Sequence, residues 1–193
     1  MTAQIEDTVT YLGHEFALAG IERGDLFRPA DYGINARGTG SACWRGSHCR
    51  YAVEGDALLL EELWVSLVLD DAVAAREGRG VPLAGRLPSY ESLGPCKFHY
   101  ERLAMPLDYT GGLLLGSGLM RFVYMGHQPA WQYQQVYELV FEGGRLIAAD
   151  DRSGAMSVVR ARLQQADGPP AADPSKDPIS AWIERCFDRS YRR

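Results

Sequence analysis

Short runs of β-forming residues, separated by glycine-containing turns, recur along most of this chain and limit what it can fold into. The first two runs are residues 8–12 and 15–18, split by Gly13 and His14. Two such runs with a glycine-containing pair between them predict a β-hairpin. Further runs rich in Val, Leu, Tyr and Phe are 49–53, 57–67, 97–103, 112–115, 119–125, 134–141 and 145–149. The pattern predicts a mainly β fold.

The turns between these runs indicate how the strands connect. We expect tight turns at 54–56 (Glu-Gly-Asp), 116–118 (Gly-Ser-Gly) and 142–144 (Glu-Gly-Gly). Residues 20–42 are expected to form a loop, because proline, asparagine and glycine interrupt any regular pattern there. The expected fold is therefore a set of antiparallel hairpins, arranged as a sandwich or as an open barrel.

Two segments near the end of the chain have helical spacing. The apolar spacing over residues 155–165 predicts one short helix. Pro178 behind Asp177 is typical of a helix start. Apolar residues then recur at spacings of three and four: Ile179, Trp182, Ile183, Cys186, Phe187 and Tyr191. This stripe predicts a C-terminal amphipathic helix over 179–193, docked on the domain or, alternatively, on a partner.

The length of 193 residues suits a single domain with its own core. We expect residues 1–165 to form the mainly β domain and 179–193 to form the C-terminal helix. Residues 166–178 are rich in proline, alanine and aspartate and are expected to form a linker. The hydrophobic share of 46% is that of a globular protein.

The charge pattern bears on the class of partner. The formal net charge is −5, and Lys97 and Lys176 are the two lysines. Binding to nucleic acid requires clustered positive charge, which this sequence lacks, so we expect no nucleic-acid partner. A modest acidic balance suits a basic protein partner. The oligomeric state is left open.

The ends and the apolar stretches bear on location. The N-terminal residues have neither a basic start nor an apolar segment, so a signal peptide is not expected. The most apolar stretch, 63–75, contains Asp70 and Asp71 and is shorter than the roughly 20 residues that span a bilayer. We therefore expect a cytoplasmic protein without a membrane partner. In that compartment the four cysteines are expected to be thiols.

Two segments combine cysteine with histidine. Residues 42–49 read Ala-Cys-Trp-Arg-Gly-Ser-His-Cys, and residues 95–99 read Pro-Cys-Lys-Phe-His. A metal-stabilised module is one hypothesis, and its ligands would be Cys43, Cys49, Cys96 and His99. The spacings differ from paired Cys-x2-Cys motifs, and buried thiols are the alternative. A nucleophilic Cys43 or Cys49 with His99 or His127 is a further alternative.

An aromatic segment, 126–133, reads as a loop between strands. It would place His127, Trp131 and Tyr133 at the rim of the sheet. Exposed Trp and Tyr are favoured at interfaces; the alternative is that they cap the end of the core. The candidate binding residues from these segments are Trp44, Arg45, His48, His99, His127, Trp131 and Tyr133.

Two segments also carry a family resemblance. The segments Ala-Cys-Trp-Arg-Gly (42–46) and Phe-Val-Tyr-Met-Gly-His (122–127) resemble those of an uncharacterised bacterial single-domain family, together with Tyr-Leu-Gly at 11–13 and the strand and turn at 137–144. Ser47 stands where that family has an aromatic residue, and Val123 where it has histidine. The resemblance covers most of residues 8–147. It implies a fold and a bacterial origin, and no mechanism.

The expected function depends on which catalytic motifs the sequence lacks. The sequence contains no phosphate-binding loop, no nucleophile elbow and no His-Glu-x-x-His motif, so we expect no catalytic residues and no cofactor. The leading hypothesis is a non-enzymatic protein-binding domain, with an immunity protein that neutralises a toxin as its most specific form. The alternative is a small-ligand-binding protein or enzyme with a cleft lined by Trp44, Arg45, His99, His127 and Trp131.

Overall fold

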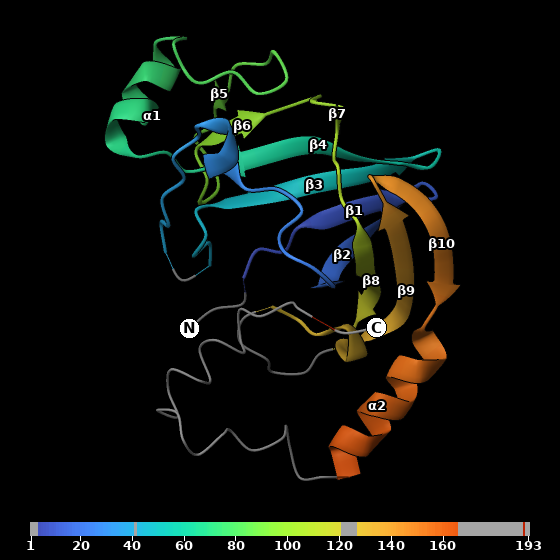
Figure 1. Ribbon diagram of the computed structural model, residues 1–193. Helices are drawn as coiled ribbons and strands as arrows, with labels where there is room; N and C mark the ends of the chain where they lie inside the picture. Colours follow the sequence, from blue (N-terminus) through green and yellow to red (C-terminus); the bar gives the residue numbers. More distant parts are fainter. Residues whose placement is uncertain (1–3, 41, 121–126, 166–190, 192–193) are drawn as a thin grey trace, which may run out of the picture.

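The chain folds into one curled sheet of ten strands, as a computed structural model shows (Figure 1). The structure describes residues 4–40, 42–120, 127–165 and 191. The strands are β1 (Thr8–Tyr11), β2 (His14–Ile21), β3 (Ser47–Glu54), β4 (Ala57–Val65), β5 (Ser89–Tyr90), β6 (Phe98–Tyr100), β7 (Met105–Pro106), β8 (Gly111–Leu119), β9 (Tyr133–Glu142) and β10 (Arg145–Asp151). The helices are α1 (Leu69–Arg76) and α2 (Ser153–Gln165), with short 3-10 helices η1 (Pro29–Tyr32) and η2 (Ala130–Gln132).

Strand pairing turns the sheet into an open barrel. The strand order is β10-β9-β8-β2-β1-β3-β4-β6-β5, and β10 also pairs with β4. At this closure Arg145 faces Ala57, and the Leu58 backbone N–H donates to the Gly144 carbonyl at 2.9 Å. The pair β1–β3 is parallel, whereas the others are antiparallel. The predicted mainly β class is confirmed, and the barrel is the arrangement that forms.

Side chains that alternate along the strands fill the barrel interior, as the period of two dictates. The interior members include Val9, Leu18, Tyr51, Leu60, Leu63, Tyr100, Leu113, Leu115, Leu139 and Phe141, each no more than 2% exposed. Tyr100 donates its hydroxyl to the Val81 carbonyl at 2.8 Å. The core therefore lies within the barrel wall, and the next residue along each strand points outward.

A second apolar cluster covers the outside of β2, β8 and β9. It consists of Ala19, Leu114, Ala130, Tyr133 and Val136, with Ala17, Met156 and Tyr191 packed against it. Helix α2 packs against β9 and η2 on this side of the barrel (Figure 1). The short helix predicted at 155–165 is thus confirmed, two residues longer at its start.

The turn predicted at 116–118 is wrong, because β8 continues through these residues. Gly116 pairs with Val136 and Ser117 pairs with Gln135. A Cβ atom on Gly116 would lie 2.4 Å from Cγ of Tyr133. This glycine therefore serves the close approach of an aromatic ring to the strand, rather than a reversal of the chain.

Two further features of the structure differ from what the sequence led us to expect. The stretch 97–103 forms a strand only over Phe98–Tyr100, because Arg102 and Ala104 have positive φ angles of 51° and 43° that end the extended run. Helix α1 was not predicted. It begins directly after β4, with Asp70 and Asp71 in its first turn, where the helix dipole favours acidic side chains.

The predicted linker 166–178 and the predicted C-terminal helix 179–193 lie outside the described residues, except for Tyr191. Tyr191 packs on the second apolar cluster, and its N–H donates to the Ile21 carbonyl at 3.3 Å. Its hydroxyl donates to Glu138 at 3.0 Å. None of the helices in the described ranges is long and apolar enough to cross a membrane.

Candidate functional site

The outer face of β3, β4 and β6 carries large polar and aromatic side chains. His48 pairs with Trp64, and Trp64 pairs with His99, so three outward side chains align across three strands. Their chain neighbours Cys49, Leu63 and Phe98 point inward and belong to the core. The alternation of each strand thus places these rings side by side outside the barrel.

The three rings form a stack. Trp64 lies between the two imidazoles, with ring centroids 4.8 Å from His48 and 4.3 Å from His99, and with interplanar angles of 2° and 8°. The guanidinium of Arg50 lies 5.4 Å from the Trp64 centroid. Parallel rings at these separations restrict one another, so the stack fixes the orientation of both imidazoles.

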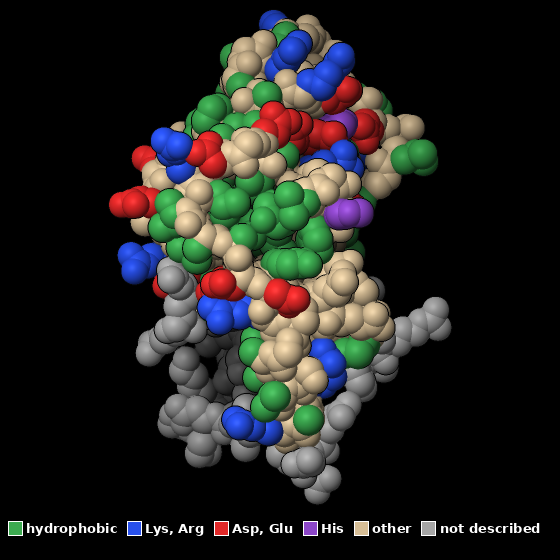
Figure 2. Space-filling model, turned by 90° about the vertical axis from the view of Figure 1, so that its right-hand side faces the viewer, with side chains coloured by type: hydrophobic (Ala, Val, Ile, Leu, Met, Phe, Trp, Pro, Cys, Tyr) green, Lys and Arg blue, Asp and Glu red, His purple; other side chains and the backbone are tan. Residues whose placement is uncertain are grey.

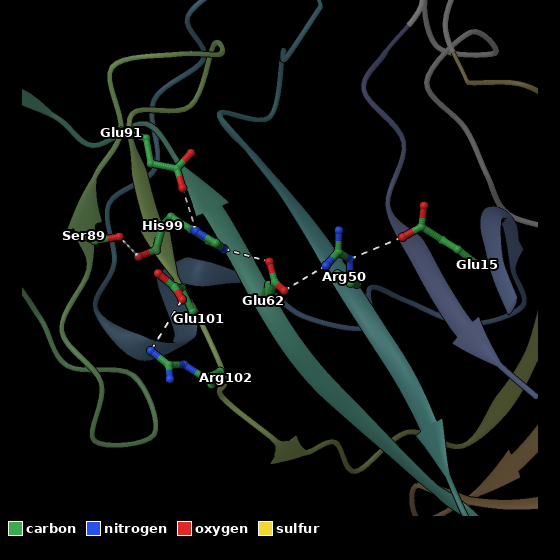
Figure 3. A network of polar contacts seen from close by, with 8 residues as sticks. All are labelled: Glu15, Arg50, Glu62, Ser89, Glu91, His99, Glu101 and Arg102. Atoms are coloured by element: carbon green, nitrogen blue, oxygen red, sulfur yellow. Dashed lines mark hydrogen bonds and ion pairs between the residues drawn. The ribbon is translucent and has the colours of Figure 1, made fainter. Parts of the chain in front are cut away.

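Carboxylates hold His99 from both sides (Figure 3). Its Nδ1 lies 2.8 Å from Oε1 of Glu91, and its Nε2 lies 2.9 Å from Oε2 of Glu62. Glu62 also accepts a hydrogen bond from Arg50 at 2.9 Å, and Arg50 forms an ion pair with Glu15 at 3.4 Å. Polar and charged groups thus form a chain across β6, β4, β3 and β2.

Negative charge accumulates around this chain. Burial, together with the nearby carboxylates of Glu54 and Glu62, raises the pKa of Glu61, and Arg50 offsets part of this effect. Acidic side chains gather around a histidine on one face of the molecule, with basic side chains beside them (Figure 2). On the outer face of β3, β4 and β6 and the residues at its edges, referred to below as the acidic face, Arg50 therefore offsets only part of the effect of the neighbouring carboxylates on Glu61.

A pair of thiols lies at the end of the ring stack. The Sγ atoms of Cys43 and Cys96 are 3.3 Å apart, and both cysteines are buried and free. The ligand atoms of Cys43, Cys96 and His48 all lie within 4.8 Å of one another. The hydrogen bond from the Cys96 thiol lowers the pKa of Cys43, against the opposing effect of burial, and the same interaction raises the pKa of Cys96. The pair is thus suited to holding one thiolate.

The loops that carry these thiols are tied to the barrel. Arg45 donates two hydrogen bonds of 3.1 Å to the buried carboxylate of Asp7. Ser66 and Thr39 both donate their hydroxyls to the Pro95 carbonyl, at 2.9 and 3.1 Å. Gly46 has a φ of 73°, and a Cβ atom there would lie 2.4 Å from the Arg37 carbonyl carbon. The segments around Cys43 and Cys96 are therefore held beside each other.

The same two loops also present apolar side chains to solvent. Trp44 is 68% exposed and Leu93 is 82% exposed. The Trp44 backbone N–H donates to Oε1 of Gln4 at 3.1 Å, which fixes the backbone beneath the exposed ring. Exposed tryptophan on a fixed backbone is a residue type that concentrates binding energy at interfaces.

The structure brings together part of the predicted metal set. Cys43 and Cys96 meet, and His48, which was predicted as a binding residue, completes their cluster. Cys49 points into the core, and its N–H donates to Oδ1 of Asp7 at 2.8 Å. His99 lies on the far side of Trp64 from His48 and contacts two glutamates.

The other predicted binding residues lie in different parts of the fold. His127 is buried, Trp131 lies in η2, and Tyr133 is 2% exposed at the start of β9. The Tyr133 hydroxyl donates to the carboxylate of Glu6, and burial raises its pKa. Tyr133 therefore caps the second apolar cluster, which was the alternative to a position at an exposed rim. The five residues of the predicted cleft come from different parts of the chain: Trp44 and Arg45 lie in the loop before β3, His99 lies in β6, His127 precedes η2, and Trp131 lies in η2.

The sequence reasoning missed the residues that organise the face. Trp64, Glu62 and Arg50 occupy outward positions of two predicted strands, and alternation with buried Leu63 and Cys49 was the available signal. Which outward residues meet depends on the register between strands, and that register is set by long-range pairing.

Comparison of the chain with known protein families, curated proteins and solved structures finds no match. The resemblance to a bacterial single-domain family therefore stays a prediction.

Proposed function

We propose that this chain is a non-enzymatic protein-binding domain that presents its acidic face to a basic protein partner. The observation that carries the proposal is a set of carboxylates along the acidic face, where burial and the charges of Glu54 and Glu62 raise the pKa of Glu61 and Arg50 offsets part of this effect. Surface carboxylates that repel one another contribute little to folding. Their complementarity to a basic surface would speed association and select the partner.

The border of the face supports a macromolecular partner. The loops that carry Trp44 and Leu93 lie beside each other, because Thr39 on one bonds to Pro95 on the other. An exposed tryptophan and leucine beside a polar surface match the composition of protein interfaces, where a few apolar anchors lie within a polar rim.

Among protein-binding functions, the most specific case is an immunity protein that neutralises a toxin. An acidic face complements the basic surface that a nucleic-acid-cleaving toxin needs to hold its own substrate. This case requires no catalytic residue in the chain and a single high-affinity partner.

The test compares partner capture by three forms of the full chain in its native host. They are the wild type, the acidic-face variant Glu54→Gln/Glu61→Gln, and the control Asp25→Asn/Glu142→Gln, which removes the same charge from exposed positions elsewhere. We expect the wild type and the control to retain one basic protein. The acidic-face variant should retain at least about tenfold less, because it lacks two charges that would attract the basic partner. Tenfold corresponds to about 1.4 kcal/mol of binding free energy.

Two further measurements complete the test. Raising the salt concentration should weaken capture by the wild type, since screened charges contribute less. If the captured protein is a toxin, co-expression of the wild type should restore growth, and the acidic-face variant should restore less of it. Equal capture by all three forms, or capture of no specific protein, would contradict the proposal.

A further inference from the structure

The thiol pair at the end of the ring stack lies beside a third possible metal ligand, the imidazole of His48. Cys43, Cys96 and His48 have ligand atoms within 4.8 Å of one another. One ring nitrogen of His48 belongs to this cluster, and its buried Nδ1 makes no hydrogen bond of ordinary geometry with a residue in the described ranges. Two buried thiols and an imidazole that converge in this way point to a group that the protein binds there.

We propose that Cys43, His48 and Cys96 form a binding site for a thiolate-preferring transition-metal ion, with Zn²⁺ as the ion that fits best. Two sulfur ligands and one imidazole are the donors that Zn²⁺ takes in proteins, whereas Mg²⁺ and Ca²⁺ prefer oxygen. Three protein ligands leave a fourth tetrahedral position open. The site does not depend on the proposed partner-binding function.

The spacing of the sulfur atoms suits this assignment. With Zn–S bonds of about 2.3 Å, tetrahedral geometry places two sulfur ligands about 3.8 Å apart. The Sγ atoms lie 3.3 Å apart here, so an adjustment of about half an ångström reaches the metal-bound geometry. A disulfide requires a separation of about 2.05 Å, which is a larger change from the observed distance.

The stack prepares the histidine for this role. Trp64 lies parallel to the His48 ring at 4.8 Å, and its other face is occupied by His99. The ring plane of His48 is therefore set before any ion binds, and a ligand held in position loses less entropy on binding. Trp64 is thus a positioning residue for the site.

The ion would connect two distant parts of the chain. Cys43 and Cys96 are 53 residues apart in sequence, and His48 begins the outer row of β3. Binding would add a cross-link between the loop 42–46 and the segment before β6. Because only the folded chain brings the three ligands together, the ion should stabilise the folded state.

The experiment titrates Co²⁺ into the full chain, purified under reducing conditions and treated with a chelator. Co²⁺ takes the same ligands as Zn²⁺ and absorbs light through thiolate-to-metal charge transfer. We expect one Co²⁺ per chain, displacement by one equivalent of Zn²⁺, and a rise in the melting temperature with either ion. Cys43→Ser and Cys96→Ser should each remove about half of the charge-transfer band and weaken binding at least about tenfold.

Three variants separate the proposal from a structural effect. Cys49→Ser, which alters a core cysteine outside the cluster, should keep the full band. His48→Gln should weaken binding while each bound ion keeps the two-thiolate band, which also provides a readout if a cysteine variant fails to fold. Trp64→Leu should weaken binding less than His48→Gln does.

Several results would overturn the assignment. One is a wild-type chain that binds less than stoichiometric Co²⁺ and shows no charge-transfer band. Another is a band that Cys49→Ser abolishes and Cys43→Ser leaves intact. A third is a Cys43–Cys96 disulfide in most of the protein after acid trapping and alkylation in its native host, because this would assign the pair to redox chemistry instead.

Discussion

Two outer faces of the same barrel are built from opposite kinds of side chain. On β2 and β8 the outward residues are apolar, and several of them, Ala17, Ala19 and Gly116, are small; α2 and Tyr191 pack on that side. On the acidic face the outward residues are large rings, which stack on one another across β3, β4 and β6. The first face is covered by packed apolar side chains, whereas the second face has polar side chains at its edges.

The difference shows how one sheet divides stability from recognition. Small outward residues allow a second layer to approach closely and bury apolar area, which stabilises the fold. Stacked rings cover the strands beneath them without a second layer, so carboxylates stay available along their border. Substitutions on the covered face should therefore change folding, and substitutions on the acidic face should change binding.

The largest effect should come from filling the space that the covered face needs. Gly116→Val adds a Cβ atom 2.4 Å from the ring of Tyr133, which is 2% exposed and cannot move aside. We expect the free energy of unfolding to fall by about 2–3 kcal/mol, since overpacking a filled site costs about that much. Urea denaturation measures the change.

A glycine with open space provides the control for this substitution. A Cβ atom on Gly154, in α2, meets no heavy atom within 4 Å. Gly154→Ala should therefore be neutral or stabilise the protein by up to about 1 kcal/mol, because alanine favours the helix. Equal losses from both substitutions would contradict the view that Gly116 is required by the approach of Tyr133.

The sequence predicted the parts of the fold that depend on local interactions and missed parts that depend on distant contacts. The hairpins at 8–18, 49–67 and 134–149 were predicted because a local turn and alternating residues define each of them. The turn expected at 116–118 was wrong, because Gly116 makes room for the ring of Tyr133 at the start of β9. A glycine required by a distant contact has the same sequence signal as one required by a turn.

The candidate site was predictable in its parts and unpredictable in its pairing. Cysteine and histidine in segments 42–49 and 95–99 drew attention to both loops, and the structure brings Cys43 and Cys96 into contact. The sequence assigned Cys49 and His99 to the same cluster, whereas His48 takes that place. One step along a strand moves a side chain from the core to the surface, so ligand identity depended on register.

A smaller effect should come from a single hydroxyl on the covered face. Tyr191 donates to Glu138, which is 4% exposed and also accepts a hydrogen bond of 2.8 Å from Arg152. Tyr191→Phe should lower the free energy of unfolding by about 1 kcal/mol, the usual net value of a hydrogen bond. Thermal and urea denaturation measure the change.

The matched control removes a hydroxyl from the edge of the acidic face. Tyr90 is 48% exposed in β5, and the guanidinium of Arg76 lies 4.2 Å from the centroid of its ring, a contact that phenylalanine keeps. Tyr90→Phe should change the stability by less than about 0.5 kcal/mol. If both tyrosine variants lose the same free energy, the covered face holds no greater share of the stability than the acidic face does.

The smallest effect should have the opposite sign and a pH dependence. Burial and the carboxylates of Glu54 and Glu62 raise the pKa of Glu61 above its ordinary value of 4.5 in the folded state. The folded chain therefore holds this proton more tightly than the unfolded chain does, so ionisation of Glu61 destabilises the fold as the pH rises. Near pH 7, Glu61→Gln should stabilise the protein by about 0.3 kcal/mol, a small value because the side chain is partly exposed and solvent screens the repulsion.

The sign can be checked by lowering the pH. Below pH 4.5 the carboxyl is protonated in both states, so the advantage of the glutamine variant should disappear. Urea denaturation of the wild type, Glu61→Gln and the exposed control Glu142→Gln at pH 7 and pH 4 measures this difference. A carboxylate that opposes folding at neutral pH is expected where a surface serves binding instead of stability. If Glu61→Gln destabilises the protein at pH 7, the acidic face contributes to folding, and the contrast between the two faces fails.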